Sequence, residues 1–108
     1  MVKSNAQVVK SIKAFARQVA HDYHIDQVIL FGSYAKGNAR DESDIDVAVI
    51  SSDFRNKPEM KILMYLSRIA TKVDCSLEAV AFYPEELIDP DPRSFSYQVK
   101  RFGRAIPF

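Results

Sequence analysis

The chain has 108 residues, of which 47% are hydrophobic and 27% are charged, and its formal net charge at pH 7 is +1. This length suits one domain over residues 1–108, and no apolar run approaches the ~20 residues that a membrane-spanning helix needs. The near-neutral charge argues against a nucleic-acid partner, because domains that bind nucleic acid usually carry a strongly basic face. No signal peptide is visible at the N-terminus, so we expect a cytoplasmic location.

The first half of the chain predicts a helix, a strand, a loop and a second strand. Apolar residues recur at helical spacing between Val8 and Tyr23. The segment Gln27–Phe31 is short, β-branched and apolar, and it ends at Gly32, which is typical of a strand that is buried on both faces. The segment Ile45–Ile50 predicts the second strand, with a polar residue only near its beginning.

The second half predicts a helix, a third strand and a short terminal helix. Pro58 is a helix-start signal, and the apolar stripe that follows it has helical spacing. The segment Val73–Phe82 then shifts toward strand periodicity, and Ser94–Arg101 predicts a last helix that Gly103 would stop. This order indicates an α/β (α+β) fold, with helices packed on a small mixed sheet. The single cysteine, Cys75, falls in the apolar third strand, so we expect a buried and inert thiol.

The turn after the first strand is suited to bind an anion. Gly32 lets the backbone turn sharply and approach a ligand closely. We expect Ser33 to cap a short helix that begins at Tyr34 and ends near Gly37, and to direct its hydroxyl and nearby N–H groups toward the anion. Considered alone, a Gly-Ser pair more often forms an ordinary turn.

Two aspartates, Asp44 and Asp46, follow this pair after ten residues, at the beginning of the second strand. Side chains two residues apart on a strand point the same way, so their carboxylates can reach two metal ions about 3.5 to 4 Å apart. A solvated strand end whose aspartates cap a turn is the structural alternative. The fixed spacing between the Gly-Ser pair and Asp-x-Asp favours the metal site, because the combination rarely arises by chance.

A site for two metal ions usually needs a further acidic ligand, and the third strand offers Asp74 and Glu78. Glu78 is the stronger candidate, because it interrupts an apolar stretch in which an unpaired carboxylate would be costly. Asp74 lies near the junction of helix and strand, where it could end the helix. Both candidates stay open at this point.

The segment Gly32–Val49 resembles the signature of the DNA polymerase beta-like nucleotidyltransferase superfamily. The whole chain is similar to the smallest members, the minimal nucleotidyltransferases of bacteria and archaea, which implies a nucleotidyltransferase fold. The resemblance assigns the triphosphate to Gly32 and Ser33, and the catalytic and magnesium-binding roles to Asp44, Asp46 and Glu78, with Asp74 as the alternative third carboxylate.

The reaction implied by the resemblance moves a nucleoside monophosphate, usually AMP from ATP, to an acceptor hydroxyl with the help of two magnesium ions. Minimal members are often encoded beside a small helical HEPN protein, and such pairs act as toxin and antitoxin. Our leading hypothesis is an antitoxin that adenylylates a hydroxyl, such as that of a tyrosine, on a HEPN toxin. Two alternatives stay open: a binding module that neutralises its partner by capture without catalysis, and an enzyme that modifies a small molecule such as an antibiotic. A homo-oligomer also stays open, because a homodimer could build an acceptor pocket.

Overall fold

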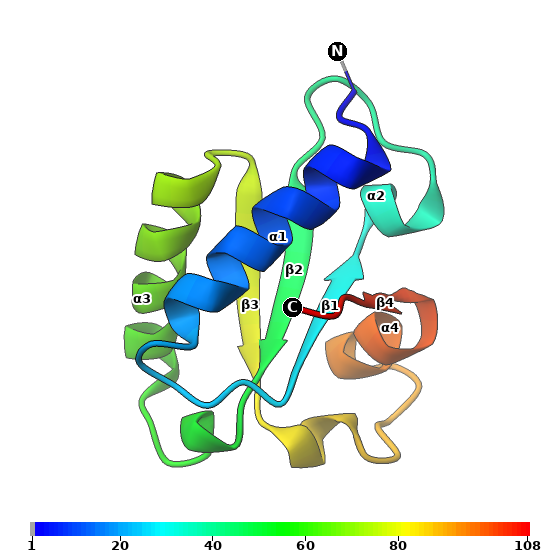
Figure 1. Cartoon of the computed structure of the whole chain (residues 1–108). Helices are drawn as coiled ribbons and strands as arrows, with labels where there is room; N and C mark the ends of the chain where they lie inside the picture. Colours follow the sequence, from blue (N-terminus) through cyan, green and yellow to red (C-terminus); the bar gives the residue numbers. More distant parts are fainter. Residues whose placement is uncertain (1) are drawn as a thin grey trace.

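The computed structural model describes residues 2–108, which form a four-stranded mixed sheet with helices on both faces (Figure 1). The strand order is β3-β2-β1-β4. The central strands β1 (Gln27–Phe31) and β2 (Ile45–Ile50) pair antiparallel, whereas β3 (Leu77–Phe82) runs parallel to β2 and β4 (Arg104–Ala105) runs antiparallel to β1. The predicted α/β fold, a small mixed sheet with helices packed on it, is confirmed.

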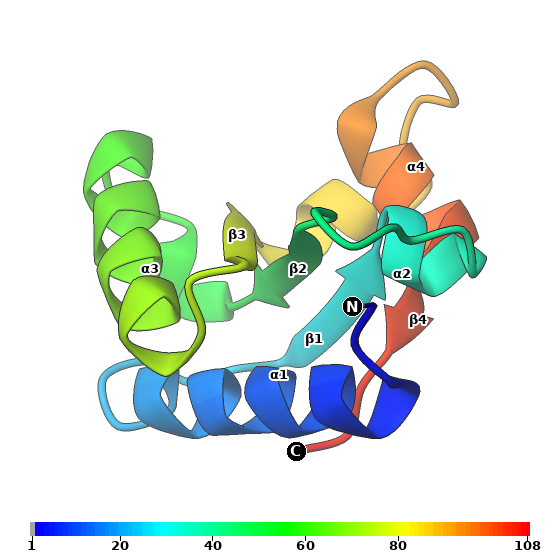
Figure 2. The same cartoon turned by 90° about the horizontal axis from the view of Figure 1, so that it is seen from above.

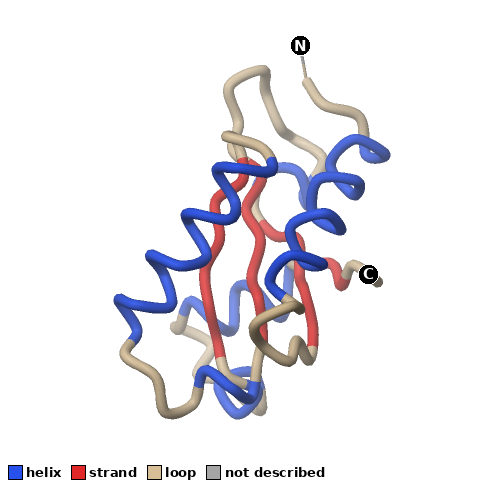
Figure 3. Tube along the Cα trace, turned by 60° about the vertical axis from the view of Figure 1, so that its left-hand side comes forward, coloured by secondary structure: helices blue, strands red, loops and turns tan. Residues whose placement is uncertain are grey.

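The two long helices cover the same face of the sheet. Side chains of α1 (Asn5–Val19) and α3 (Glu59–Val73) share one buried cluster with alternate residues of β1, β2 and β3. The opposite face is covered by α4 (Phe95–Phe102) and the 3-10 helix η2 (Pro84–Leu87), which contribute Val99 and Leu87 to a second buried cluster. Figure 2 shows α1 and α4 on opposite sides of the sheet, and Figure 3 shows the long helices running alongside the strands.

Helix α1 begins with a capping box. The backbone N–H of Gln7 donates to the Ser4 hydroxyl at 3.2 Å, and the Gln7 side chain accepts from the Ser4 N–H at 2.8 Å. The apolar face that the sequence predicts is buried, and its buried residues are Val8, Ile12, Phe15, Ala16 and Val19. The helix ends at Val19, four residues before Tyr23, because the chain must turn there to enter β1.

Strand β3 begins at Leu77 and is therefore shorter than the strand predicted over Val73–Phe82. Val73 is the last residue of α3, and Asp74 is its C-cap, with a backbone N–H that donates to the Ala70 carbonyl at 2.9 Å. Cys75 lies in the turn between helix and strand and is exposed, so the expectation of a buried thiol was wrong. Residues 74–76, which the periodicity assigned to the third strand, form the turn between α3 and β3.

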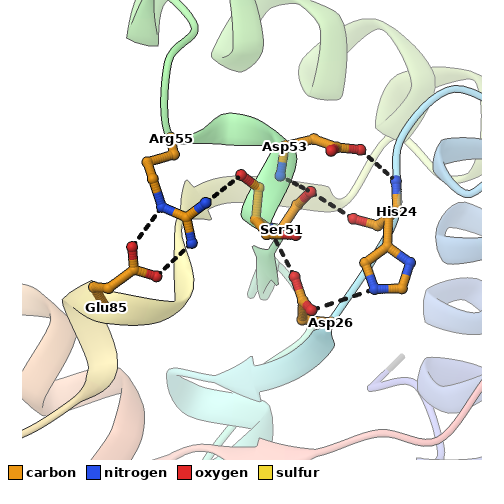
Figure 4. A network of polar contacts seen from close by, with 7 residues as sticks. His24, Asp26, Ser51, Asp53, Arg55 and Glu85 are labelled. Atoms are coloured by element: carbon orange, nitrogen blue, oxygen red, sulfur yellow. Dashed lines mark hydrogen bonds and ion pairs between the residues drawn. The ribbon is translucent and has the colours of Figure 1, made fainter.

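A polar network ties the segment before β1 to the segment after β2 (Figure 4). The Ser51 hydroxyl is fully buried and donates to the His24 carbonyl at 2.5 Å. The His24 N–H donates to the Asp53 carboxylate at 2.8 Å, and the Ser52 N–H donates to Asp26 at 2.6 Å. The 3-10 helix η1 (Ser52–Phe54) comes next, and residues 55–58 connect it to α3. These bonds join both chain segments at the end of the strand pair where β1 begins and β2 ends.

The C-terminal part follows the prediction for its helix and adds a strand. The Ser94 hydroxyl caps α4 by accepting from the Tyr97 N–H at 3.1 Å, and Gly103 is the C-cap. The two-residue strand β4 comes directly after and was not predicted. None of the helices within residues 2–108 has the length and apolar character needed to cross a bilayer. The single domain over residues 1–108, whose first residue lies outside the described part, and the cytoplasmic location stay predictions.

Candidate active site

Three residues on neighbouring strands form a row across the sheet. Phe31 of β1 pairs with Asp46 of β2, and Asp46 pairs with Glu78 of β3. Paired residues on neighbouring strands point to the same face, and the alternation along β2 places Asp46 on the face of Ala48, which packs in the cluster below α4. Asp44 precedes β2 and shares this parity. The strand register therefore brings the predicted Asp44, Asp46 and Glu78 to one face of the sheet.

The three carboxyl groups influence one another electrostatically. Partial burial raises the pKa of Asp46, and the charge of Asp44 raises it further. A hydrogen bond with Asp44 raises the pKa of Glu78 most, and burial and the charges of Asp44 and Asp46 add to the shift. Like charges this close favour the protonated forms, so the ionised cluster carries a free-energy cost that a bound cation would offset.

The carboxyl groups are close, but they are not gathered into a metal-ligand shell. Within residues 2–108, no group of three His, Cys, Asp or Glu side chains is assembled for metal coordination. Asp44 and Glu78 are exposed, and Asp46 is half-buried. The site therefore consists of three carboxyl groups on one face of the sheet, two of them exposed.

The turn at Gly32 lies directly against this row. Gly32 has φ 75° and ψ −153°, a backbone conformation that essentially only glycine adopts. A Cβ atom at this position would lie 2.2 Å from Oδ2 of Asp46. The missing side chain therefore makes room for the Asp46 carboxylate, and it links the Gly-Ser turn and the aspartates into one site.

The short helix after this turn begins one residue earlier than predicted. Helix α2 covers Ser33–Lys36, and Gly32 is its N-cap, so the expectation that Ser33 caps the helix was wrong. The Lys36 N–H donates to the Gly32 carbonyl at 3.1 Å, which places Ser33 in the first turn. Gly37 ends the helix in the left-handed conformation, as predicted. The first N–H groups of such a helix find no partner within it and point along its N-terminal end.

The two candidates for the third carboxylate have different environments. Asp74 accepts hydrogen bonds from the Ser76 N–H at 3.0 Å, the Ser76 hydroxyl at 2.7 Å and the Ser11 hydroxyl at 3.0 Å. Burial acts to raise the pKa of Asp74, but these hydrogen bonds outweigh it and hold the pKa below its usual value. Asp74 thus ties the end of α3 to α1, whereas Glu78 lies beside Asp46.

An aromatic residue that the sequence did not single out lies next to the row. Phe95, the first residue of α4, is 51% exposed, and its ring centroid lies 5.5 Å from that of Phe31 and 5.7 Å from that of Phe82. Phe31 is the cross-strand partner of Asp46. No sequence signal identifies this neighbour, because residues 31 and 95 meet only through the tertiary fold.

Residues 10–89 match the family model described as "Polymerase beta, Nucleotidyltransferase". The chain belongs to this nucleotidyltransferase family. Two relatives from Methanocaldococcus jannaschii support the assignment. "Putative protein adenylyltransferase MJ0141" is 32% identical over 79 residues, which cover 70% of this chain and 80% of the relative. "Putative protein adenylyltransferase MJ1379" is 30% identical over 78 residues, which cover 68% and 77%.

Solved structures agree with the nucleotidyltransferase fold. A "putative nucleotidyltransferase from Sulfolobus solfataricus" superposes with a TM-score of 0.67 at 19% identity, covering 97% of this chain and 89% of the other. A structure described as "the toxin-antitoxin with AMP-PNP" superposes with a TM-score of 0.63 at 22% identity, covering 92% and 72%. The predicted family, fold and enzyme class of this nucleotidyltransferase are confirmed.

Proposed function

We propose that this nucleotidyltransferase moves AMP from ATP to a hydroxyl on a protein partner, and that Asp44, Asp46 and Glu78 are its catalytic residues and magnesium ligands. The observation that carries the proposal is the register of Asp46 with Glu78, together with the influence of Asp44 and Asp46 on the pKa of Glu78. Gly32 and Ser33 form the adjoining turn and would receive the triphosphate.

The donor set fits magnesium. Carboxylate oxygens are the protein ligands that this hard cation prefers. The raised pKa values of Asp46 and Glu78 mean that positive charge placed among these groups would relieve a repulsion already present. Two magnesium ions, when bound, would lower the pKa of the acceptor hydroxyl and neutralise the charge that develops on the pyrophosphate.

The chain's own residues have defined tasks in the transfer. The acceptor oxygen attacks the α-phosphorus, the bond from this phosphorus to the bridging oxygen breaks, and pyrophosphate leaves with the electron pair. Glu78 would receive the acceptor's proton on its carboxylate, which lies beside Asp46 in the strand register. Gly32 leaves room for the Asp46 carboxylate beside the phosphates.

The nature of the partner is supported by the relatives and by one structural neighbour. Two relatives carry the description "Putative protein adenylyltransferase", and one neighbour is described as "the toxin-antitoxin with AMP-PNP". Together with the resemblance to minimal nucleotidyltransferases, these names favour ATP as donor and a small helical HEPN toxin as acceptor. In this role the chain is the antitoxin, and adenylylation silences the toxin.

The test is to incubate the protein with labelled ATP, magnesium and the product of the neighbouring gene. We expect label on the partner with the wild type, and none with Asp44→Asn or Asp46→Asn. Asp89→Asn is the matched control, because it removes one charge from an exposed residue whose φ of 48° asparagine tolerates well. Absence of label with the wild type, or label that survives both site substitutions, would refute the proposal.

The same variants separate the two alternatives. If the Asp44→Asn and Asp46→Asn proteins still neutralise the toxin without labelling it, the chain acts by stoichiometric capture. If the wild type labels an antibiotic and leaves the partner unlabelled, the acceptor is a small molecule.

A further inference from the structure

Phe95 has a fixed place at the edge of the carboxylate row. Its ring meets the rings of Phe31 and Phe82 at interplanar angles of 73° and 53°, with centroids 5.5 and 5.7 Å apart. Edge-to-face and tilted contacts of this kind hold an aromatic ring in one orientation. Phe82 is buried and Phe31 is half-buried, so the inner side of Phe95 is anchored while 51% of the residue stays exposed.

The strand register shows where this ring lies on the sheet. Phe31 pairs with Asp46 of β2. Phe82 pairs with Ile50, which lies four residues after Asp46 on the same strand. A ring that contacts both Phe31 and Phe82 spans the row between them, in which Ala48 pairs with Val80. Phe95 therefore lies over an apolar part of the sheet face that adjoins the carboxylates.

Exposure alone does not distinguish Phe95, since single exposed apolar side chains are common. Phe102, about two turns further along α4, is 50% exposed. However, Lys36 and Arg101 place their cationic groups 5.9 and 5.8 Å from the centre of the Phe102 ring, so cations already lie over that ring. Among the exposed aromatic residues of α4, Phe95 is the one anchored beside the row.

We propose that Phe95 is the platform on which the base of the nucleoside triphosphate stacks, while the phosphates meet the Gly32 turn and the carboxylates. This inference rests on the proposed function and defines how the same site holds its donor. Stacking on an aromatic ring depends on the face of the base and not on its edges, and it strengthens binding by about tenfold or more. Phe95 therefore increases affinity for ATP and GTP alike.

The test compares binding of magnesium-ATP with binding of magnesium-tripolyphosphate, which has no base, by titration calorimetry. In Phe95→Leu we expect affinity for ATP and for GTP to fall by about tenfold and affinity for tripolyphosphate to stay unchanged. Leucine keeps the apolar contact with the sheet, so we expect this variant to retain its fold. A melting temperature equal to that of the wild type checks this. Phe95→Trp should restore ATP affinity, because tryptophan also offers a stacking face.

Phe108→Leu is the matched control. This phenylalanine is 46% exposed at the C-terminus, which Figures 1 and 2 place on the α1 side of the sheet, away from α4. We expect its ATP affinity to equal that of the wild type. Unchanged ATP affinity in Phe95→Leu, or an equal loss for ATP and tripolyphosphate, would overturn the inference while leaving the proposed transfer intact. A wild type that binds neither ligand would overturn both.

Discussion

Replacing Gly32 by alanine should damage catalysis far more than it damages folding. The added Cβ would lie 2.2 Å from Oδ2 of Asp46 and 3.1 Å from its Cγ, so the carboxylate must move by about an ångström to a normal contact distance. A misplacement of about 1 Å in a catalytic group can cost about 100-fold in rate. The strained backbone adds about 1 to 3 kcal/mol to the cost of folding.

Gly37→Ala is the matched comparison. Gly37 also has a positive φ, 80°, but a Cβ there would meet no atom within 4 Å. Its alanine variant should lose about 1 to 2 kcal/mol of stability and keep its activity. Urea denaturation gives the free energy of unfolding of both variants, and labelled AMP transfer gives kcat/KM. Equal transfer rates for the two variants would refute the link between the turn and Asp46.

Three further predictions concern the carboxylates. Without magnesium, Asp44→Asn should raise the free energy of unfolding at pH 7 by a few tenths of a kcal/mol, because it removes repulsion from Asp46 and Glu78 that solvent partly screens. A lower melting temperature would contradict this. Glu78→Gln should abolish AMP transfer while Asp74→Asn retains it, and the reverse result would assign the third carboxylate to Asp74. The pKa of Asp74 is lower in the folded protein than in the unfolded chain. The ionised Asp74 carboxylate therefore stabilises the fold at pH values above the unfolded pKa, and this contribution is lost as the pH falls through the folded pKa. Asp74→Asn should therefore unfold at lower urea than the wild type at pH 7. This difference should shrink as the pH falls below the usual aspartate pKa of about 4, and a difference that stays constant would argue against it.

The central strands could be predicted from the sequence because their signal is local. The bounds of β1 and β2 follow from short β-branched runs, and the first ends at Gly32. Strand β4 could not be predicted, because two residues are too few for a periodic pattern and its pairing with β1 depends on the tertiary fold. The early start assigned to β3 failed because the Asp74 N–H ends α3 on the Ala70 carbonyl and the Asp74 side chain holds the following turn at Ser76.

Some features of the candidate site could also be predicted from local sequence, and others depend on the tertiary fold. The spacing of Asp44 and Asp46 predicted two carboxylates on one face, and the register with Glu78 agrees with that geometry. The sequence favoured Glu78 and left Asp74 open, and it could not show their surroundings: Asp74 accepts from hydroxyl groups, whereas Glu78 lies beside Asp46. The contact of Phe95 with Phe31 joins segments that are far apart in the chain, so no local pattern contains it.

The most direct test of the account is the intact mass of the partner after co-expression with this nucleotidyltransferase. We predict that the wild type and Asp89→Asn add the mass of AMP to the partner, and that Asp46→Asn leaves it unmodified. Treating the purified wild type with a magnesium chelator should likewise prevent addition in vitro. A partner that gains AMP in the presence of the Asp46→Asn protein, or that gains none with the wild type, would contradict the claim that the row of carboxylates on β2 and β3 catalyses the transfer.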